Sequence, residues 1–315
     1  MGVVLLLILL VLGTAGYFGY KWLTSVANTA GNTSSTSSGG TNGNSGSNGN
    51  TPAAIPAVTA QINAQITYSS VDITILNIQK ASSFSDDTDA NSPVLVRLNV
   101  KEHNPTTDTV YLSYGDNYRL ILPDGTSVNP GNEHDSGGID QAVTRTNWID
   151  FPVSSSVDLS KLTVRLGAAS QAQMDVPLTG NADLSKYQPK TISPNTAFQY
   201  AGLKWTLTTV TSSLSADGKQ ADSGMRYIVV TLKVDNPTAD TFYPSTSDNM
   251  RLQAGSTTNP PTGSTLPTSI AAGTTNTTGT LTFQMPQNGG SFTLIMLARP
   301  DTTPPAAQYT TNFQI

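Results

Sequence analysis

The chain has 315 residues, a formal net charge of −5 and no cysteine, and only 12 % of its residues are charged. This length is enough for two domains of ordinary size. Zero cysteines exclude disulfides, thiolate metal sites, a thiol nucleophile and a cysteine-linked lipid anchor, and the lack of any Lys/Arg stripe argues against nucleic-acid binding.

The first segment, residues 1–23, is MGVVLLLILLVLGTAGYFGYKWL, and it has no charged side chain before Lys21. Its nineteen uncharged residues from position 2 to 20 would form a helix of roughly 28 Å, close to the thickness of a bilayer's hydrocarbon core. Aromatic rings near position 20 suit the headgroup layer. We therefore expect a single-pass membrane helix that contacts the bilayer through residues 2–23, with the C-terminal domains extracellular.

Two alternatives for this segment stay open. Ser25-Val26-Ala27 has the small-x-small pattern of a signal-peptide cleavage site, although the apolar run is long and no basic region precedes it. A chain start upstream of Met1 is the other alternative. A single lysine does not fix the orientation of the helix, and the small-xxx-small pair Ala15 and Gly19 allows self-association.

Residues 24–60 contain a low-complexity run, SSTSSGGTNGNSGSNGNTP, that is nearly free of apolar and charged side chains. Such a segment buries too little apolar surface to offset its ordering entropy. We expect a flexible linker here.

Residues 61–183 show the alternation of half-buried strands. The apolar positions of the first two predicted strands are Tyr68, Val71, Ile73, Ile75 and Ile78, followed by Val96, Leu98 and Val100. Between them, residues 85–92 (SDDTDANS) begin like a calcium loop with Asp87, Asp89 and Asn91. Because Ser92 and Leu98 replace the glycine and glutamate of such loops, we favour a solvated loop, and calcium binding stays open.

Residues 104–120, NPTTDTVYLSYGDNYRL, follow as a strand end and a turn. The Asn-Pro pair ends one strand because proline donates no ladder hydrogen bond. We expect Asp108 to cap the turn with a side-chain oxygen and Tyr111 to pack under the corner. Asp116 and Arg119 are expected to form a local ion pair or turn cap.

After a short joint with two prolines, residues 184–196, the same pattern returns in residues 197–315. At an offset of 132, NPTADTFYPSTSDNMRL (236–252) matches eleven of the seventeen letters of 104–120, so the chain contains two copies of one domain. Farther on, 147–153 resembles 280–286 and 161–166 resembles 291–296. The equivalent positions in the second copy are Tyr200, Leu203, Trp205, Leu207, Val210, Ile228, Val230, Leu232, Asp240, Tyr243, Asp248 and Arg251.

Turn residues recur about every ten positions, and no amphipathic helix is evident after residue 24. The predicted fold is all-β, with two tandem immunoglobulin-like antiparallel β-sandwiches after the membrane helix and disordered linker.

The motif order, with Asn-Pro-Thr-x-Asp, Tyr, Asp-Asn-x-Arg-Leu and Pro-Asp-Gly, resembles a family of bacterial cell-surface domains of unassigned function. That family is related to the mycobacterial immunoprotective extracellular antigen. The resemblance covers about 65–180 and 197–315, and it implies an immunoglobulin-like fold behind a membrane helix. It implies no catalytic or ligand residue. The second copy departs from the pattern at Pro123-Asp124-Gly125, where it has Ala254-Gly255.

Motifs of enzymes are missing from the sequence. His103 and His134 have no metal-ligand spacing, no Gly-x-Ser-x-Gly elbow occurs, and Trp148 and Trp205 fit core positions of strands. We therefore expect no enzyme activity, no catalytic, cofactor-binding or metal site, and no cofactor.

The sequence favours a membrane-anchored surface protein whose two domains bind an envelope or extracellular partner, an unknown protein, wall polymer or glycan. The alternative is a structural spacer or a self-assembling surface-layer or filament component, and an envelope hydrolase ranks third.

Overall fold

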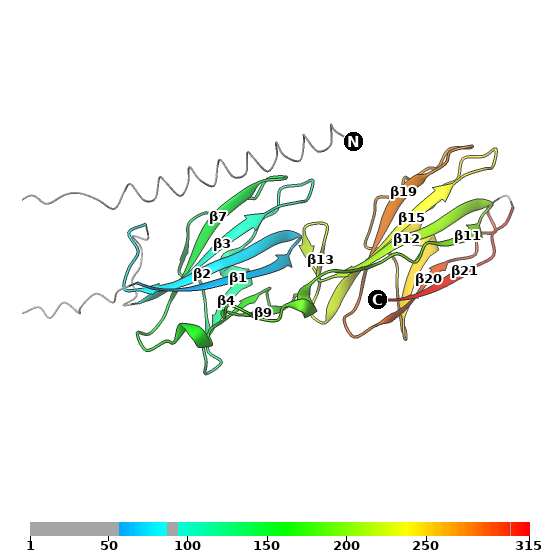
Figure 1. Ribbon diagram of the computed structural model, residues 1–315. Helices are drawn as coiled ribbons and strands as arrows, with labels where there is room; N and C mark the ends of the chain where they lie inside the picture. Colours follow the sequence, from blue (N-terminus) through cyan, green and yellow to red (C-terminus); the bar gives the residue numbers. More distant parts are fainter. Residues whose placement is uncertain (1–56, 87–93, 303) are drawn as a thin grey trace, which may run out of the picture. The chain divides into compact units, whose positions relative to one another are not determined.

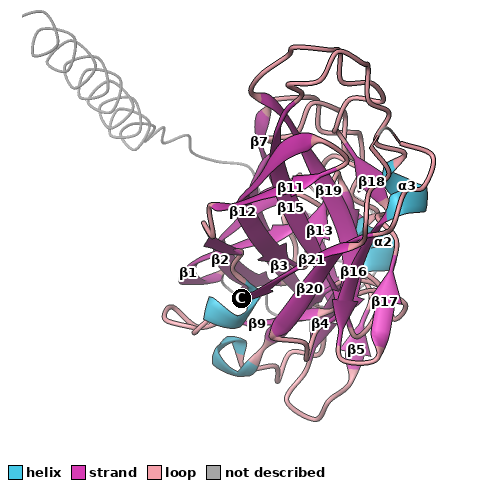
Figure 2. Ribbon diagram, turned by 90° about the vertical axis from the view of Figure 1, so that its right-hand side faces the viewer, coloured by secondary structure: helices cyan, strands magenta, loops and turns pink. Residues whose placement is uncertain are grey.

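The computed structural model describes residues 57–86, 94–302 and 304–315, and these residues form an all-β fold of antiparallel sheets. The only helical elements among them are single turns, shown in cyan in Figure 2. The membrane helix predicted at 1–23, nearly all of the 24–60 linker and most of loop 85–92 lie outside the described residues. None of the helices within the described ranges has the length and apolar character needed to cross a bilayer. The helical elements are α2 (Tyr114–Asn117), α3 (Thr246–Asn249), η1 (Leu159–Lys161) and η2 (Ser185–Tyr187).

The first copy contains a five-stranded sheet and a four-stranded sheet. The larger sheet has the order β1-β2-β3-β7-β6, from β1 (Val58–Tyr68), β2 (Val71–Ala81), β3 (Leu95–His103), β7 (Thr144–Pro152) and β6 (Asn132–Glu133). The smaller sheet has the order β5-β4-β8-β9, from β5 (Ser127–Val128), β4 (Tyr118–Ile121), β8 (Thr163–Leu166) and β9 (Met174–Pro177).

The second copy repeats this arrangement, and Figure 1 shows β12, β15 and β19 side by side as β2, β3 and β7 are. Its larger sheet contains β10 (Lys190–Ile192), β11 (Thr196–Tyr200), β12 (Leu203–Ser213), β15 (Met225–Asp235), β19 (Thr277–Pro286) and β18 (Gly263–Ser264). Its smaller sheet has the order β17-β16-β20-β21, from β17 (Thr257–Asn259), β16 (Met250–Ala254), β20 (Ser291–Met296) and β21 (Tyr309–Gln314).

Strand register shows which residues of the two copies are equivalent. Val96 pairs with Phe151, and Ile228 pairs with Phe283, so the offset of 132 continues through β7 and β19. The sequence match of 147–153 to 280–286 was therefore wrong by one residue, which would turn every side chain to the opposite face of the sheet. The match of 161–166 to 291–296 is confirmed, because β8 and β20 pair with β4 and β16 in the same register.

A β-bulge explains one irregularity in the predicted alternation. Ile75 and Ile78 are three residues apart and yet both are buried, because the register of β2 shifts between Ile75 and Asn77. The extra residue restores the inward direction of the following side chains. The second copy has the same shift between Leu207 and Thr209, so the bulge belongs to the repeated design.

Each copy has its own hydrophobic core between its two sheets. All the apolar positions predicted from alternation lie in these cores, and Trp205 is fully buried. Inward-facing residues of the larger and the smaller sheet belong to the same core cluster, for example Val96 and Leu120 in the first copy. The described residues therefore confirm an all-β fold with the predicted inward faces.

The joint between the copies is more ordered than a linker. Strand β10 lies within the predicted linker 184–196, and it pairs with β12 as Val58–Ala60 of β1 pairs with β2. A small hairpin of the second copy, β13 (Ser215–Ala216) and β14 (Lys219–Gln220), contacts the first copy. Across this joint Ala172 N donates to Ala221 O over 2.7 Å, and Ser223 N donates to Ser170 O over 2.8 Å.

Candidate functional site

The repeated motif folds around a buried asparagine. The Asn104 side chain is fully buried, and its Nδ2 donates to Asp108 O and Ile139 O, both over 2.7 Å. Its Oδ1 accepts hydrogen bonds from Thr106 N over 2.9 Å and from Thr106 Oγ1 over 2.7 Å. The amide is thereby fully satisfied, and the loop that follows β3 has a fixed backbone.

The second copy uses the same device. Asn236 Nδ2 donates to Asp240 O over 2.8 Å and to Ile270 O over 3.0 Å, and its Oδ1 accepts from Thr238 Oγ1 over 2.6 Å. In both copies the capping oxygen belongs to the asparagine. The prediction that the Asp108 and Asp240 carboxylates cap this turn was wrong, because those residues supply main-chain carbonyls. We name residues 105–111 and 237–243 the tyrosine loops.

The tyrosine loops present their aromatic side chains to solvent. Tyr111 is 72 % exposed and Tyr243 is 60 % exposed, so the prediction that they pack under the corner was wrong. The preceding residues turn inward instead, because Val110 bridges Ile139 and Phe242 bridges Ile270 through main-chain hydrogen bonds. Alternation then places the next side chain outward. Two copies thus display a large aromatic ring at the same position.

The arginines of the motif act as turn caps. Arg119 Nη1 donates to Gly115 O and Tyr118 O, both over 2.6 Å, and Arg251 Nη1 donates to Ser247 O and Met250 O, both over 2.7 Å. The predicted turn cap is therefore present. Within the described residues no ion pair joins these arginines to Asp116 or Asp248.

A groove runs beside the tyrosine loop of the first copy. Its other wall is the tip of the β13–β14 hairpin, Asp217 to Lys219, and its volume is about 570 Å³. Gly218 N donates to Ser70 Oγ over 3.1 Å, which fixes the tip against the first copy. The groove combines an aromatic ring with hydroxyl, carboxylate and ammonium groups. Its lining consists of Pro105, Thr106, Thr107, Asp108, Thr109, Val110, Tyr111, Asp217, Gly218 and Lys219.

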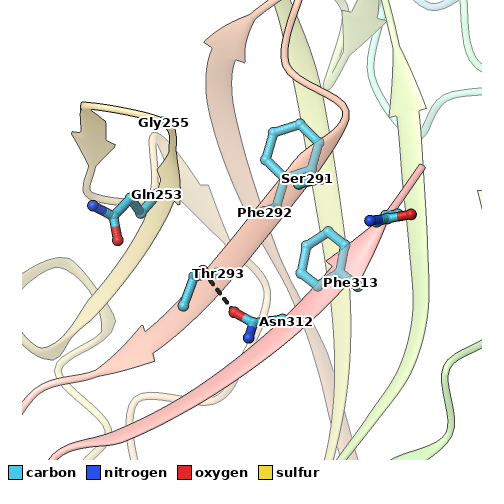
Figure 3. A pocket seen from close by; sticks show the side chains of 8 residues that line it. Gln253, Gly255, Ser291, Phe292, Thr293, Asn312 and Phe313 are labelled. Carbon is cyan, nitrogen blue, oxygen red and sulfur yellow. Dashed lines mark hydrogen bonds between the residues drawn. The ribbon is translucent and has the colours of Figure 1, made fainter.

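A second hollow lies over the smaller sheet of the second copy (Figure 3). Its volume is about 610 Å³, and Thr293 Oγ1 donates to Asn312 Oδ1 over 2.7 Å on its floor. Phe292 and Phe313 are only 2 % and 7 % exposed, so they belong to the core rather than to a binding surface. The described side chains that line this hollow are amides, hydroxyls and two phenylalanines, and none of them carries an ionisable group.

The first copy buries a polar cluster beneath its tyrosine loop. Tyr114 Oη donates to the fully buried Glu102 carboxylate over 2.7 Å, and Arg145 Nε donates to Glu102 Oε2 over 2.8 Å. Asn147 Nδ2 donates to Tyr114 Oη over 2.8 Å. Burial, together with the nearby Glu102 charge, raises the pKa of Tyr114 far above its usual value. Glu102 has no exposed surface and Tyr114 is only 1 % exposed, so these two side chains lie inside the first copy.

This cluster also forms hydrogen bonds to loop 134–140, which lies against the Tyr111 ring. Arg145 Nη1 donates to Gly137 O over 3.0 Å, and Asn147 Nδ2 donates to Asp135 O over 2.8 Å. A Cβ at Gly138 would lie 2.9 Å from Cε1 of the Tyr111 ring, so only glycine allows the ring to lie against this loop. Loop 134–140 therefore backs the exposed ring.

A second ionic cluster lies on the outer face of the larger sheet. Arg97 forms two hydrogen bonds with Asp150, of 2.8 and 2.7 Å, and one of 2.6 Å with Asp86. Its guanidinium lies 4.0 Å from the Phe84 ring and 3.9 Å from the Trp148 ring. Trp148 is therefore buried, at 8 % exposure, but it packs on a cation and lies outside the main apolar cluster, whereas Trp205 is part of such a cluster.

Neither histidine lies in a cluster of metal-ligating side chains. His103 Nδ1 is 3.0 Å from Thr144 Oγ1, and His134 packs against the Trp148 ring. Within the described ranges no three His, Cys, Asp or Glu side chains are placed to hold a metal ion. Asp87, Asp89 and Asn91 of the predicted loop 85–92 lie outside the described residues.

The chain was compared with protein-family models, curated proteins and solved structures. No protein-family model matches the chain, and no curated protein matches it. Among solved structures it is similar to a crystal structure described as the conserved domain protein from Bacillus anthracis. The sequence identity is 7 %, the TM-score is 0.22, and the match covers 82 % of this chain and 90 % of that one.

Proposed function

We propose that this chain is a non-enzymatic binding protein whose two domains, tandem immunoglobulin-like sandwiches, engage an envelope or extracellular partner through the tyrosine loops. The observation that carries this proposal is the equivalent exposure of Tyr111 and Tyr243. Exposed rings on a rigid loop offer contact area at a low entropic cost, and such residues often dominate binding energy. The proposed anchor is a membrane helix over 1–23, with both domains outside the cell and the 24–60 segment as tether.

A capture experiment tests the binding role. The purified chain is immobilised and exposed to envelope fractions that contain proteins, wall polymers and glycans. A Tyr111→Ala/Tyr243→Ala variant should lose the captured component, because both rings are removed while the core stays intact. Val143→Ala is the matched control, since Val143 is also an exposed apolar side chain at 41 % exposure. Equal capture by the tyrosine variant and the control would reject the proposal.

The outward orientation is tested separately. Protease added to intact cells should cleave the domains if they lie outside the membrane, and should spare them in unbroken cells if they lie inside. This experiment does not depend on the identity of the partner.

A structural spacer is the second candidate, and the main-chain hydrogen bonds across the joint favour it. The hydrogen bonds between residues 170–172 and 221–223 join the two copies at the joint. A spacer that assembles side by side would show concentration-dependent self-association in sedimentation experiments. A monomer at all concentrations would argue against the self-assembling form.

A further inference from the structure

The groove beside Tyr111 has the size of a ligand site and continues into a second hollow. Its volume is about 570 Å³, and a hollow of about 410 Å³ shares Pro105, Thr106 and Asp217 with it. Ligand pockets usually measure about 300–1,000 Å³. Two contiguous hollows along the joint suit an extended polymer better than a compact molecule.

Both walls of the groove are held in place without a ligand. Gly218 at the hairpin tip has a φ of 73°, and a Cβ there would lie 3.6 Å from Val110 Cγ2, so the tip is in van der Waals range of the tyrosine loop. Gln220 Nε2 donates to Ala172 O over 2.7 Å and fixes the base of the hairpin. A site that is already ordered loses little entropy on binding.

The Tyr111 ring is a fixed platform at the edge of this groove. One side lies against Gly138, whose loop is anchored by Arg145, and the ring is 72 % exposed. A planar apolar surface of this kind can stack against the C–H face of a sugar ring, and the phenol hydroxyl can hydrogen-bond at the same time.

The charges of the groove select against polyanions. Its lining contains the carboxylates of Asp108 and Asp217 and one ammonium group, that of Lys219. Two negative charges against one positive charge repel a phosphate- or carboxylate-bearing chain. Carboxylates accept hydrogen bonds from sugar hydroxyls, whereas Lys219 and the threonines of the loop donate them.

We propose that this groove binds a neutral polysaccharide chain, which stacks on Tyr111 and runs along the joint between the two copies. The proposal deepens the proposed function and rests on it. The site requires both copies, since one supplies the ring and the other supplies Asp217 and Lys219. Tyr243 has a different neighbour, Arg299, whose Nη1 donates to Tyr243 O over 3.1 Å, and it does not line this groove.

The test uses the full chain in mild detergent on an array of neutral hexose and N-acetylhexosamine oligosaccharides, followed by calorimetric titration with any oligosaccharide that binds. Tyr111→Ala should weaken binding about tenfold or more, as for a central aromatic contact. Tyr111→Phe keeps the ring and should restore most of the affinity. Lys219→Ala should weaken binding by a smaller factor, and Val143→Ala, an exposed position outside the groove lining, should leave it unchanged.

Several outcomes would overturn the polysaccharide site. These are no binding to any neutral oligosaccharide, binding that Tyr111→Ala does not weaken, or stronger binding to heparin or polyphosphate than to neutral chains. If an envelope component is still captured through the tyrosine loops while neutral oligosaccharides do not bind, the polysaccharide site fails and the binding role stands. If the tyrosine variant captures as the control does, both proposals fail.

Discussion

The two copies differ at one buried position near the tyrosine loop. The first copy has Glu102 there, and the second copy has Val234 at the equivalent position of its strand. The neighbours differ in the same way. Arg145, which pairs with Glu102 across β3 and β7, corresponds to Thr277, and Tyr114 corresponds to Thr246. The second copy keeps the same strand order without the cluster. The cluster is therefore not required by the topology, and in the first copy it anchors loop 134–140 behind Tyr111.

The largest effect is expected for Glu102→Ala. Removing this carboxylate leaves the Arg145 guanidinium, only 13 % exposed, without its buried partner. Breaking a buried ion pair typically costs about 3–5 kcal/mol in the free energy of unfolding. Denaturant unfolding of the variant and the unsubstituted chain measures this loss.

The residues of the second copy suggest a double variant that should recover the stability lost when Glu102 is replaced. Glu102→Val combined with Arg145→Thr places the residues of the second copy in the first, so no buried charge is left unpaired. This double variant should be more stable than Glu102→Val alone, because replacing a buried ion pair as a whole is often nearly neutral. Additive losses in the double variant would show that Glu102 and Arg145 are not coupled.

The next effect should be equal in the two copies. Asn104→Ala and Asn236→Ala each remove a fully buried amide together with its hydrogen bonds to the loop. Each change should lower the free energy of unfolding by about 2–4 kcal/mol, since several main-chain groups lose their partners. Denaturant unfolding of each single variant compares the two losses. A large difference would mean that the asparagine has different roles in the two copies.

Alkaline pH should distinguish the copies again. Burial raises the pKa of Tyr68 to about 12, and it raises the pKa of Tyr118 as well. The unfolded chain loses these protons near pH 10, so the stabilisation is complete below that pH and is lost as pH rises toward the folded-state pKa. Each such tyrosine lowers the free energy of unfolding by about 1.4 kcal/mol per pH unit in this window.

The first copy should therefore unfold before the second as pH rises above 10. Burial also raises the pKa of Tyr200 and Tyr227 in the second copy, but that copy has Met250 in place of Tyr118 and Thr246 in place of Tyr114. Denaturant titrations at neutral and alkaline pH measure this, and Tyr68→Phe should flatten the dependence in the first copy. If both copies unfolded at the same pH, the buried tyrosines of the first copy would not be the cause of its alkaline unfolding.

A smaller effect, of opposite sign, is expected for Tyr118→Phe. The Tyr118 hydroxyl is buried and has no hydrogen-bond partner among the described residues. Removing an unsatisfied polar atom from a core should raise the free energy of unfolding by up to about 1 kcal/mol. Thermal unfolding measures this change, and a loss of stability would indicate a partner for the hydroxyl, such as a buried water.

The smallest effect concerns the exposed rings. Tyr111→Ala and Tyr243→Ala should each change the free energy of unfolding by less than about 0.5 kcal/mol, as is usual for surface positions. Denaturant unfolding checks this. A large loss in either variant would mean that the ring stabilises the fold, and it would remove the reason for assigning a binding role to that loop.

The sequence by itself determined the all-β class, the duplication and the inward faces of the main strands. Alternation can be read within a single segment, and the duplication can be read by comparing two segments of the linear sequence, so neither requires knowledge of tertiary contacts. The match of Trp205 to a core position was also correct, because its neighbours alternate without interruption.

Only the tertiary structure decided which side chains meet. It placed Tyr111 and Tyr243 outside, because the Asn-centred hydrogen bonds fix the loop so that Val110 and Phe242 turn inward. It brought Lys219 beside Tyr111 although they are far apart in the sequence, since the hairpin reaches across the joint. Burial, buried ion pairs and grooves between copies depend on contacts distant in sequence, and no periodicity of a single segment encodes them.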